Sequence, residues 1–272
     1  MTRPSLQPLE RFSPAALARV RCVLTDIDDT LTSDGLLRPA AFAAIHRLAQ
    51  AGIRVVPVTG RPAGWCDLIA RQWPVAGVIG ENGALWFRYD PGGPRIARGH
   101  WFPEDRRQAD RLRLDDLARR IAEEIPEARP TSDQAYRESD LAIDWCEDVA
   151  PLSRAQLDRI VELAEEAGAT VRVSSIHVNI WFGEFSKLAM TERFLADGLG
   201  IDLRSDPDAF VFAGDSPNDS TMFGFFANSV GVANVLDFVG RMEAEPTYVT
   251  PSRGGEGFAE LADALLAART GG

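Results

Sequence analysis

Short runs of consecutive apolar residues, at positions 23–24, 55–58 and 75–79, alternate with amphipathic segments in the first part of the chain. The segment 36–52 carries apolar residues at helical spacing and ends at a glycine, which indicates a helix between the first two runs. Strands buried on both faces of a parallel sheet are apolar at successive positions. The alternation of strand and helix therefore predicts a parallel sheet with helices on both faces.

The pattern changes in the middle of the chain. A long amphipathic helix is predicted up to Pro126, and a second helix begins at a capping box formed by Ser153 and Gln156. Strands are predicted at 141–145, 171–173 and 177–182. Together these elements indicate a separate α+β unit of about 100 residues, a usual size for a domain.

The α/β pattern returns after residue 185. Ser186 is expected to cap a helix that runs to Ala196, with Gly198 behind it, and further strands are predicted at 210–213, 230–232 and 247–249 before a closing helix. The fold class is therefore α/β. We expect a Rossmann-like core domain made of residues 1–85 and 186–272, interrupted by an inserted α+β domain at 86–185.

Composition is that of an ordinary globular protein, with 45% hydrophobic and 25% charged residues in a chain of 272. The formal net charge of −11 argues against nucleic acid or an anionic membrane as partner, because both need clustered Lys and Arg. Cys22, Cys66 and Cys146 have neither zinc-ligand spacing nor a disulfide framework. No signal-peptide pattern and no apolar run of about 18–20 residues occurs, so a cytoplasmic protein with free thiols is expected.

Candidate catalytic residues lie at the ends of the predicted core strands, where open parallel sheets bind their ligands. Asp26, Asp28 and Asp29 place three carboxylates within four residues, so either water solvates them or a cation neutralises them. Mg²⁺ suits such a site because it is a hard ion that takes oxygen ligands. Thr59-Gly60-Arg61 follows the next strand and offers a hydroxyl and backbone N–H groups to a phosphoryl oxygen.

Two later segments complete the set. Lys187 starts a predicted helix, and a cation at that positive end indicates a bound anion. Residues 214–219, Gly-Asp-Ser-Pro-Asn-Asp, follow another core strand. Each segment also has a purely structural interpretation: polar turns for the aspartate clusters, a hydroxyl that ends a strand for Thr59, and a solvated side chain for Lys187.

Taken together and in this order, the segments resemble the four motifs of the haloacid dehalogenase (HAD) superfamily. The matching residues are Asp26-x-Asp28-x-Thr30, Thr59, Lys187 and Gly214-Asp215-x-x-Asn218-Asp219. The insertion lies where that family places its type-two cap domain. Gly80-Glu81-Asn82-Gly83-Ala84 resembles the segment leading into the cap in the Cof-like subfamily IIB, which includes sucrose-, trehalose- and mannosylglycerate-type phosphatases and phosphomannomutases. One departure is Asp29, where Gly is commoner.

The resemblance implies a phosphatase with an aspartyl-phosphate intermediate. Asp26 would be the nucleophile, Asp28 the general acid and then base, and Thr59 and Lys187 would hold the phosphoryl oxygens. Gly60, Arg61 and Asn218 are further candidates for substrate binding. Mg²⁺ would be bound by Asp26, the main-chain carbonyl of Asp28 and Asp215, with Asp219 supporting the metal shell or orienting Lys187.

The inserted domain is expected to select the substrate. His177, Asn179 and Trp181 alternate along one predicted strand and share a face that suits sugar hydroxyls, although an ordinary exposed face fits the pattern equally well. Arg137 and Glu138 are interpreted as solvated loop residues that could instead touch substrate.

The expected substrate is a small phosphorylated metabolite, most simply a sugar phosphate. The sequence does not indicate the oligomeric state. Two alternatives stay open. One is a phosphomutase, which would return the phosphoryl group from Asp26 instead of giving it to water. The other is a non-catalytic metabolite-binding protein, which would be expected to lack a motif residue.

Overall fold

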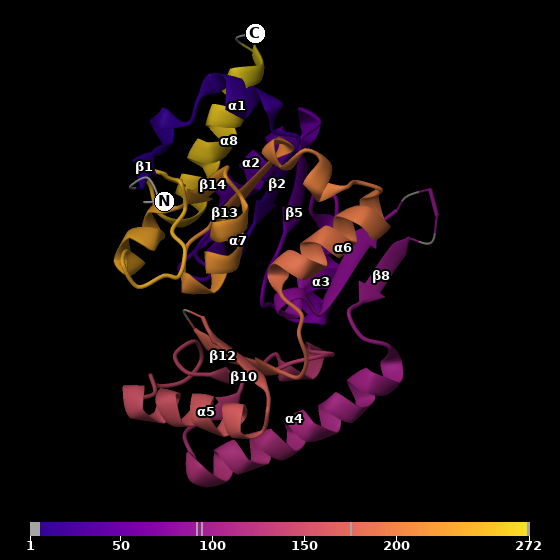
Figure 1. Ribbon diagram of the computed structural model, residues 1–272, viewed down its shortest axis with the longest axis vertical. Coiled ribbons are helices and arrows are strands. Elements are labelled where there is room, and N and C mark those ends of the chain that lie inside the picture. Colours follow the sequence, from indigo (N-terminus) through magenta and orange to yellow (C-terminus); the bar gives the residue numbers. More distant parts are fainter. Residues whose placement is uncertain (1–5, 91, 94, 175, 271–272) are drawn as a thin grey trace.

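The computed structural model describes residues 6–90, 92–93, 95–174 and 176–270. These residues form two units, a larger one around a parallel sheet and a smaller one below it in Figure 1. The middle of the chain builds the lower unit, and segments from both sides of it build the upper unit, as the sequence predicts.

Parallel strands form the central sheet of the upper unit. In spatial order they are β1 (Gln7–Pro8), β15 (Tyr248–Val249), β14 (Ser229–Gly231), β13 (Phe210–Gly214), β2 (Cys22–Thr25) and β5 (Arg54–Pro57). In the register of the sheet, Thr25 is paired with Ala213 on one side and with Pro57 on the other. The carboxyl ends of β2, β5 and β13 therefore meet at one edge, which is the edge predicted to carry the chemistry.

Helices cover both faces of this sheet, as expected. One face is covered by α1 (Pro14–Arg19), α2 (Pro39–Gln50), α3 (Ala63–Gln72) and α8 (Gly254–Thr270), the other by α6 (Lys187–Leu199) and α7 (Ser220–Phe225). Successive residues of β2 point to opposite faces, so Val23 packs with the first helix layer and Leu24 with the second. This double burial explains the continuous apolar runs.

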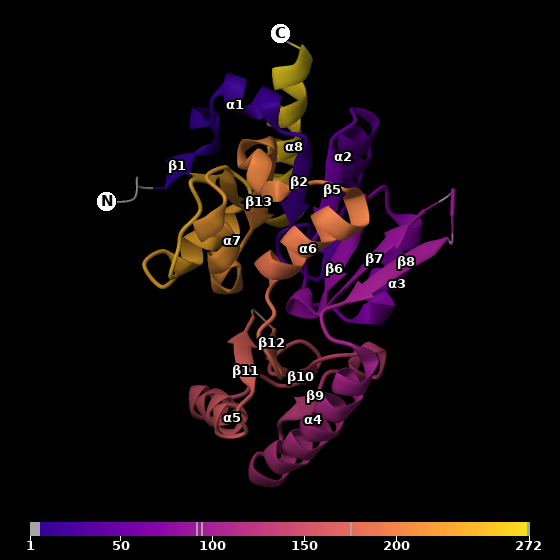
Figure 2. The same cartoon turned by 45° about the vertical axis from the view of Figure 1, so that its right-hand side comes forward.

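A three-stranded antiparallel sheet extends the central sheet. The sequence predicts only the first of its strands. This sheet contains β6 (Val78–Gly80), β7 (Leu85–Tyr89) and β8 (Ile96–His100), and a bridge from Val58 to Ile79 links it to the main sheet (Figure 2). Leu85 and Phe87 are buried in the core of the upper unit. The expected domain boundary at residue 86 therefore falls inside β7, and we infer that the inserted unit starts near α4.

The lower unit is an antiparallel sheet covered on one face by two helices. Its strands, in spatial order, are β11 (Thr170–Val173), β12 (His177–Trp181), β10 (Leu141–Asp144) and β9 (Arg129–Pro130), and its helices are α4 (Glu104–Glu124) and α5 (Arg154–Glu166). The predicted capping box of Ser153 and Gln156 is present at the start of α5. Val178 and Ile180 pack under the helices, so the other face of β12 is directed toward the upper unit.

The predicted end of α6 is wrong. Gly198 lies inside this helix, which ends at Leu199 and is capped by Gly200 in a left-handed conformation with φ 67°. A side chain at residue 198 would collide with Phe194, because a Cβ there would lie 2.7 Å from its ring. Close packing, and not helix termination, accounts for this glycine.

Within the described residues, Cys22, Cys66 and Cys146 are not joined to one another by disulfide bonds. Within the described part of the chain, none of the helices combines the length and the hydropathy of a membrane span.

Candidate active site

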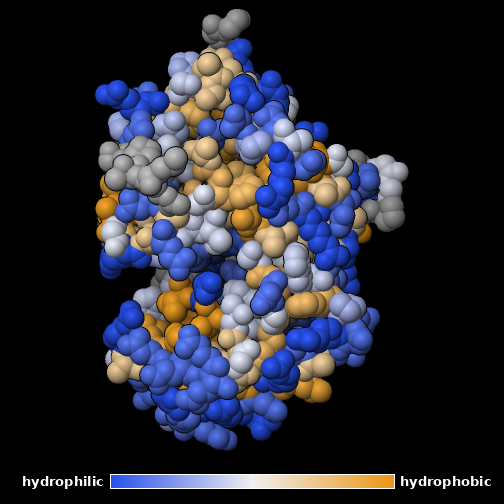
Figure 3. All heavy atoms as spheres, in the orientation of Figure 1, coloured by the Kyte–Doolittle hydropathy of each residue, from blue (hydrophilic) through white to orange (hydrophobic). Residues whose placement is uncertain are grey.

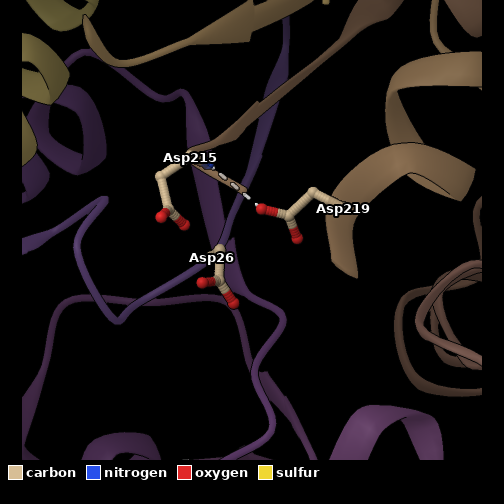
Figure 4. A group of neighbouring side chains, drawn as sticks. All are labelled: Asp26, Asp215 and Asp219. Atoms are coloured by element: carbon tan, nitrogen blue, oxygen red, sulfur yellow. Dashed lines mark hydrogen bonds between the residues drawn. The ribbon is translucent and has the colours of Figure 1, made fainter. Parts of the chain in front are cut away.

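Asp26, Asp215 and Asp219 form a buried cluster at the carboxyl edge of the sheet (Figure 4). Asp26 follows β2, and its backbone N–H donates to the carbonyl of Ala213 at 2.9 Å. Asp215 follows the neighbouring strand β13, and its backbone N–H donates to Oδ2 of Asp219 at 3.1 Å. A Cβ at Gly214 would lie 2.4 Å from that same oxygen, which explains why glycine ends the strand.

Lys187 connects two of these carboxylates. Its Nζ donates to Oδ1 of Asp26 at 2.8 Å and to Oδ1 of Asp219 at 2.7 Å, and its side chain is buried. Ser186 caps α6 as expected, and the loop at Gly83 approaches so closely that a Cβ there would lie 2.2 Å from the carbonyl oxygen of Ser186. The solvated interpretation of Lys187 is therefore wrong.

The electrostatics of the cluster favour a bound cation. Burial raises the pKa of Asp26 to about 7, with Lys187 opposing and the charges of Asp219 and Asp28 adding to the rise. Burial, together with the charges of Asp219 and Asp26, raises the pKa of Asp215 well above its ordinary value. One ammonium therefore faces three carboxylates, each of which offers an oxygen within 4.8 Å of the others. Mg²⁺ fits this donor set, because it is a hard ion that takes carboxylate oxygens.

The departure at Asp29 has a local explanation. Asp29 adopts a left-handed conformation with φ 56°, in the loop that joins Asp28 to Thr30. Glycine adopts this conformation without cost, and Asp is one of the few other residues that tolerate it. Thr30 in turn donates to Oδ1 of Asp215 at 3.3 Å, which ties the loop to the second aspartate.

Asp28 lies apart from the three-aspartate cluster, and its side chain is 23% exposed. Its carboxylate accepts three hydrogen bonds from Arg61, at 2.8, 2.9 and 3.1 Å. Arg61 also donates to Oε1 of Glu147 at 2.7 Å, and Nε2 of His177 lies 2.7 Å from Oε2 of the same glutamate. The structure thus links Asp28 of the upper unit to His177 of the lower unit through an arginine and a glutamate.

Thr59 is fully buried just after the end of β5. Its backbone N–H donates to the carbonyl of Ile79 at 2.9 Å, and its hydroxyl accepts from the backbone N–H of Arg61 at 3.0 Å. Gly60 lies against Asn82, whose side chain a Cβ at residue 60 would approach to 3.1 Å. The segment Gly80-Glu81-Asn82 therefore supports the Thr59 loop from behind, with Glu81 and Asn82 both at positive φ.

A pocket between the two units brings most of the predicted residues together. From the upper unit it is lined by Asp26, Asp28, Arg61 and Asp215, with Gly60 and Asn218 beside them. His177 and Asn179 of β12 line it from the lower unit. Figure 3 shows the surface hollowed between the two units. Thr59 and Lys187 do not line the pocket, although Lys187 contacts Asp26 from behind.

Trp181 is not part of this pocket. Its ring stacks on Phe185 with ring centroids 5.2 Å apart, and both pack with Ala84 at the junction of the two units. Trp181 is the last residue of β12, and it packs with Phe185 and Ala84 where the chain passes back into the upper unit. A period of two assigns His177, Asn179 and Trp181 to one face of the strand, but it cannot show which of them lines a pocket and which packs at a junction.

Three residues of the interface were missed or misread. Glu81 is fully buried and accepts from the backbone N–H groups of Ala63, Glu138 and Ser139, so it connects both units. Arg137 is buried and donates to the carbonyl of Gly60 at 2.9 Å, which contradicts a solvated loop position. Glu147 follows Asp144 in an acidic turn after a strand, a signal that resembles those used for the core motifs.

A family model described as haloacid dehalogenase-like hydrolase matches residues 23–96. The sequence finds no significant match among curated proteins.

Several solved structures share the fold. A Synechocystis sucrose-phosphatase is 18% identical at a TM-score of 0.61, covering 90% of this chain and 97% of its own. A Plasmodium vivax protein described as a HAD/COF-like hydrolase is 18% identical at 0.66, covering 93% and 98%. The C-terminal domain of Candida albicans trehalose-6-phosphate phosphatase is 13% identical at 0.65, covering 99% of each chain. The family match is confined to residues 23–96, and the shared architecture shows that the chain has the fold of these hydrolases and phosphatases.

Proposed function

We propose that the protein is a Mg²⁺-dependent phosphatase of a small phosphorylated metabolite, with Asp26 as nucleophile. One observation carries this proposal. The buried Asp26 carboxylate lies at a pocket, accepts a hydrogen bond from Lys187, and has Asp215 and Asp219 beside it. A buried carboxylate with one oxygen held by a lysine presents its other oxygen for attack. The family match supports the hydrolase class.

In the proposed reaction, Oδ2 of Asp26 attacks phosphorus and the bond from phosphorus to the leaving oxygen breaks. Asp28 gives its proton to that oxygen, then takes a proton from the water that cleaves the aspartyl phosphate. Lys187 neutralises phosphoryl oxygens from its position beside Asp26, and Thr59 bonds to them through its hydroxyl.

Asp26 and Asp215 are the proposed carboxylate ligands of Mg²⁺, with the main-chain carbonyl of Asp28 as a further ligand. Asp219 supports them, because its carboxylate already binds Lys187 and the N–H of Asp215. The bound ion neutralises negative charge between the nucleophile and the phosphate.

A sugar phosphate is the proposed substrate class. Asn179 is buried beside the pocket, and its Oδ1 has no hydrogen-bond partner among the described residues. A buried polar atom without a partner carries a free-energy cost that a bound ligand removes. His177 lies beside it and offers a second polar group. Two of the structural neighbours are described as sucrose- and trehalose-6-phosphate phosphatases, which act on phosphorylated sugars by name.

The lower unit must move to admit such a substrate. The enclosed space between the units is about 20 Å³, which is room for roughly one water molecule. We propose that the lower unit acts as a cap that opens for binding and closes for reaction, which would exclude bulk water from the intermediate.

A screen of phosphorylated metabolites for phosphate release, with and without Mg²⁺, tests this proposal. The expected result is Mg²⁺-dependent release from one or a few sugar phosphates, abolished in Asp26→Asn. Formation of an isomeric sugar phosphate that needs a bisphosphate activator would indicate a phosphomutase instead. Binding of a sugar phosphate without any turnover would indicate a non-catalytic protein.

A further inference from the structure

We propose that Glu147 is a positioning residue for Asp28 and acts through Arg61. The inference rests on the proposed function, in which Asp28 is the general acid and base. Glu147 belongs to the turn after β10 in the lower unit, whereas Asp28 and Arg61 belong to the upper unit. Their contact therefore exists only while the two units are closed on each other.

Arg61 is held in one orientation by partners on several sides. Its Nε and Nη2 donate to Asp28 at 2.9 and 2.8 Å, and its Nη2 also donates to Glu147 at 2.7 Å. The guanidinium carbon lies 4.4 Å from the ring centroid of Trp65, and the side chain is only 5% exposed. The planar guanidinium makes paired bonds to a carboxylate, so fixing its plane also fixes the plane of the Asp28 carboxylate.

Glu147 is itself held by a built turn. Asp144 is 2% exposed, and its carboxylate accepts from the backbone N–H groups of Cys146, Glu147 and Asp148 at 2.8 to 3.0 Å. His177 contacts Oε2 of Glu147 at 2.7 Å. The hydrogen bond to His177, with Arg61 adding to it, lowers the pKa of Glu147 to about 2. The glutamate is thus a fixed anion under ordinary conditions.

Direct substrate binding is a weaker explanation for Glu147. Oε1 accepts from Arg61, and Oε2 contacts both His177 at 2.7 Å and Nη1 of Arg61 at 3.4 Å, so both oxygens are already engaged. A carboxylate would also repel the phosphate of the substrate. Instead, Glu147 binds Arg61 from the lower unit while Arg61 still binds Asp28. Closure of the cap is thereby coupled to the orientation of the Asp28 carboxylate.

The test compares Glu147→Gln with Asp148→Asn, a matched loss of one carboxylate at the next residue. The Asp148 side chain accepts from Ser132 on the lower unit, away from Arg61. Turnover is measured with phosphate esters of poor leaving groups, such as alkyl phosphates, and of good ones, such as nitrophenyl phosphate. The rate compared is that of Asp26 phosphorylation, because a misplaced acid slows this step only where the leaving oxygen needs a proton, whereas a misplaced base slows hydrolysis of the intermediate for every ester.

The expected result for Glu147→Gln is a loss in the pre-steady-state rate of Asp26 phosphorylation of about ten-fold or more with alkyl esters and of less than about two-fold with nitrophenyl phosphate. Asp148→Asn should behave like the wild type with both. An equal loss for both leaving groups, or no loss for either, would overturn the inference. Because the Glu147 side chain is 29% exposed, the variant should fold. If it does not, Glu147→Asp, which keeps the charge and shortens the reach, carries the same comparison.

A double variant tests the route through Arg61. If Glu147 acts only by way of Arg61, adding Glu147→Gln to Arg61→Ala should change kcat by less than about two-fold. A further loss of the full single-variant size would contradict this route.

Asp28→Asn, measured in parallel, distinguishes failure of the proposed acid role of Asp28 from failure of the proposed positioning role of Glu147. Failure of Asp28→Asn to slow alkyl ester turnover would contradict the proposed acid role itself. A normal leaving-group effect in Asp28→Asn with none in Glu147→Gln would overturn only the inference about Glu147.

Discussion

Asp26 and Asp215 leave neighbouring parallel strands within one residue of each other, because the register pairs Thr25 with Ala213. The inserted unit and most of the core lie between them in the sequence, yet one hydrogen-bonded register brings them together. Asp219 and Lys187 then complete a buried cluster with a single ammonium. The candidate chemistry of this protein therefore depends on the edge of one sheet, where these two aspartates lie at the proposed cation site.

The proposed acid and base role of Asp28 predicts that the effect of its loss depends on the leaving group. Asp28→Asn should slow phosphorylation of Asp26 by alkyl phosphates by about 100-fold or more, and by aryl phosphates much less, because aryl oxides leave without protonation. Hydrolysis of the intermediate should slow for both. Pre-steady-state phosphorylation rates measure the first step. Equal losses for good and poor leaving groups would argue against an acid role.

The proposed metal site predicts that loss of one ligand selectively weakens Mg²⁺ binding. Chelator should abolish activity, Mg²⁺ should restore it, and Ca²⁺ should inhibit, because Ca²⁺ takes more ligands and can engage both oxygens of Asp26. Asp215→Asn should weaken Mg²⁺ binding by about ten-fold or more, measured by calorimetric titration without substrate. Asp237→Asn, at an exposed ion pair with Arg253, is the matched control and should bind Mg²⁺ normally. Unchanged affinity in Asp215→Asn would contradict the site.

Asn179 and Trp181 should respond differently although they share one strand. Asn179→Ala should lower kcat/KM for the preferred metabolite by about ten-fold and leave aryl phosphate turnover and the melting temperature nearly unchanged. Trp181→Ala should instead destabilise the fold by about 3–5 kcal/mol, since its ring packs on Phe185. Substrate panels and thermal melts distinguish the two. A substrate-selective loss in Trp181→Ala would contradict its assignment to the junction.

Glu81 predicts a pH dependence of stability. Burial, with the charge of Asp140 adding to it, raises the pKa of Glu81 from 4.5 to about 7. A raised carboxyl pKa contributes stability that is fully present below pH 4.5 and is lost as the pH rises to about 7. The free energy of unfolding of Glu81→Gln relative to wild type should therefore rise by more than ~1 kcal/mol across this window, since one pKa unit is worth about 1.4 kcal/mol.

Urea unfolding at several pH values measures this difference. Glu165→Gln, at an exposed position of α5, is the matched control for the loss of a carboxylate. A relative stability of Glu81→Gln that falls as the pH rises would contradict the assignment.

The core motifs were readable from the sequence because they combine two local signals. Asp26 and Asp215 each come just after a short apolar run, and each begins a cluster of polar residues. Parallel strands end at one edge of a sheet, so residues far apart in sequence could be assigned to one site. The same reasoning placed Lys187 at the start of a helix, where the structure has it.

The interface between the two units could not be read in this way. Glu147, Arg137 and Glu81 meet the other unit through contacts that depend on how the units are oriented, and no periodicity encodes that orientation. The sequence assigns Arg61 to the site, but it does not show that Arg61 donates hydrogen bonds to both Asp28 and Glu147. The β7–β8 hairpin was also missed, because its strands are partly exposed and carry arginine, and so lack a continuous apolar run.

Direct detection of a phosphorylated Asp26 tests the central claim. The enzyme is mixed with a turned-over sugar phosphate and Mg²⁺, quenched in acid within one turnover, and its peptides are examined by mass spectrometry. The account predicts one transient phosphoryl group on Asp26 in wild type, a longer-lived one in Asp28→Asn, and none in Asp26→Asn, which should be inactive but folded. Phosphate release at the wild-type rate by Asp26→Asn, or a phosphoryl group on another residue, would contradict it.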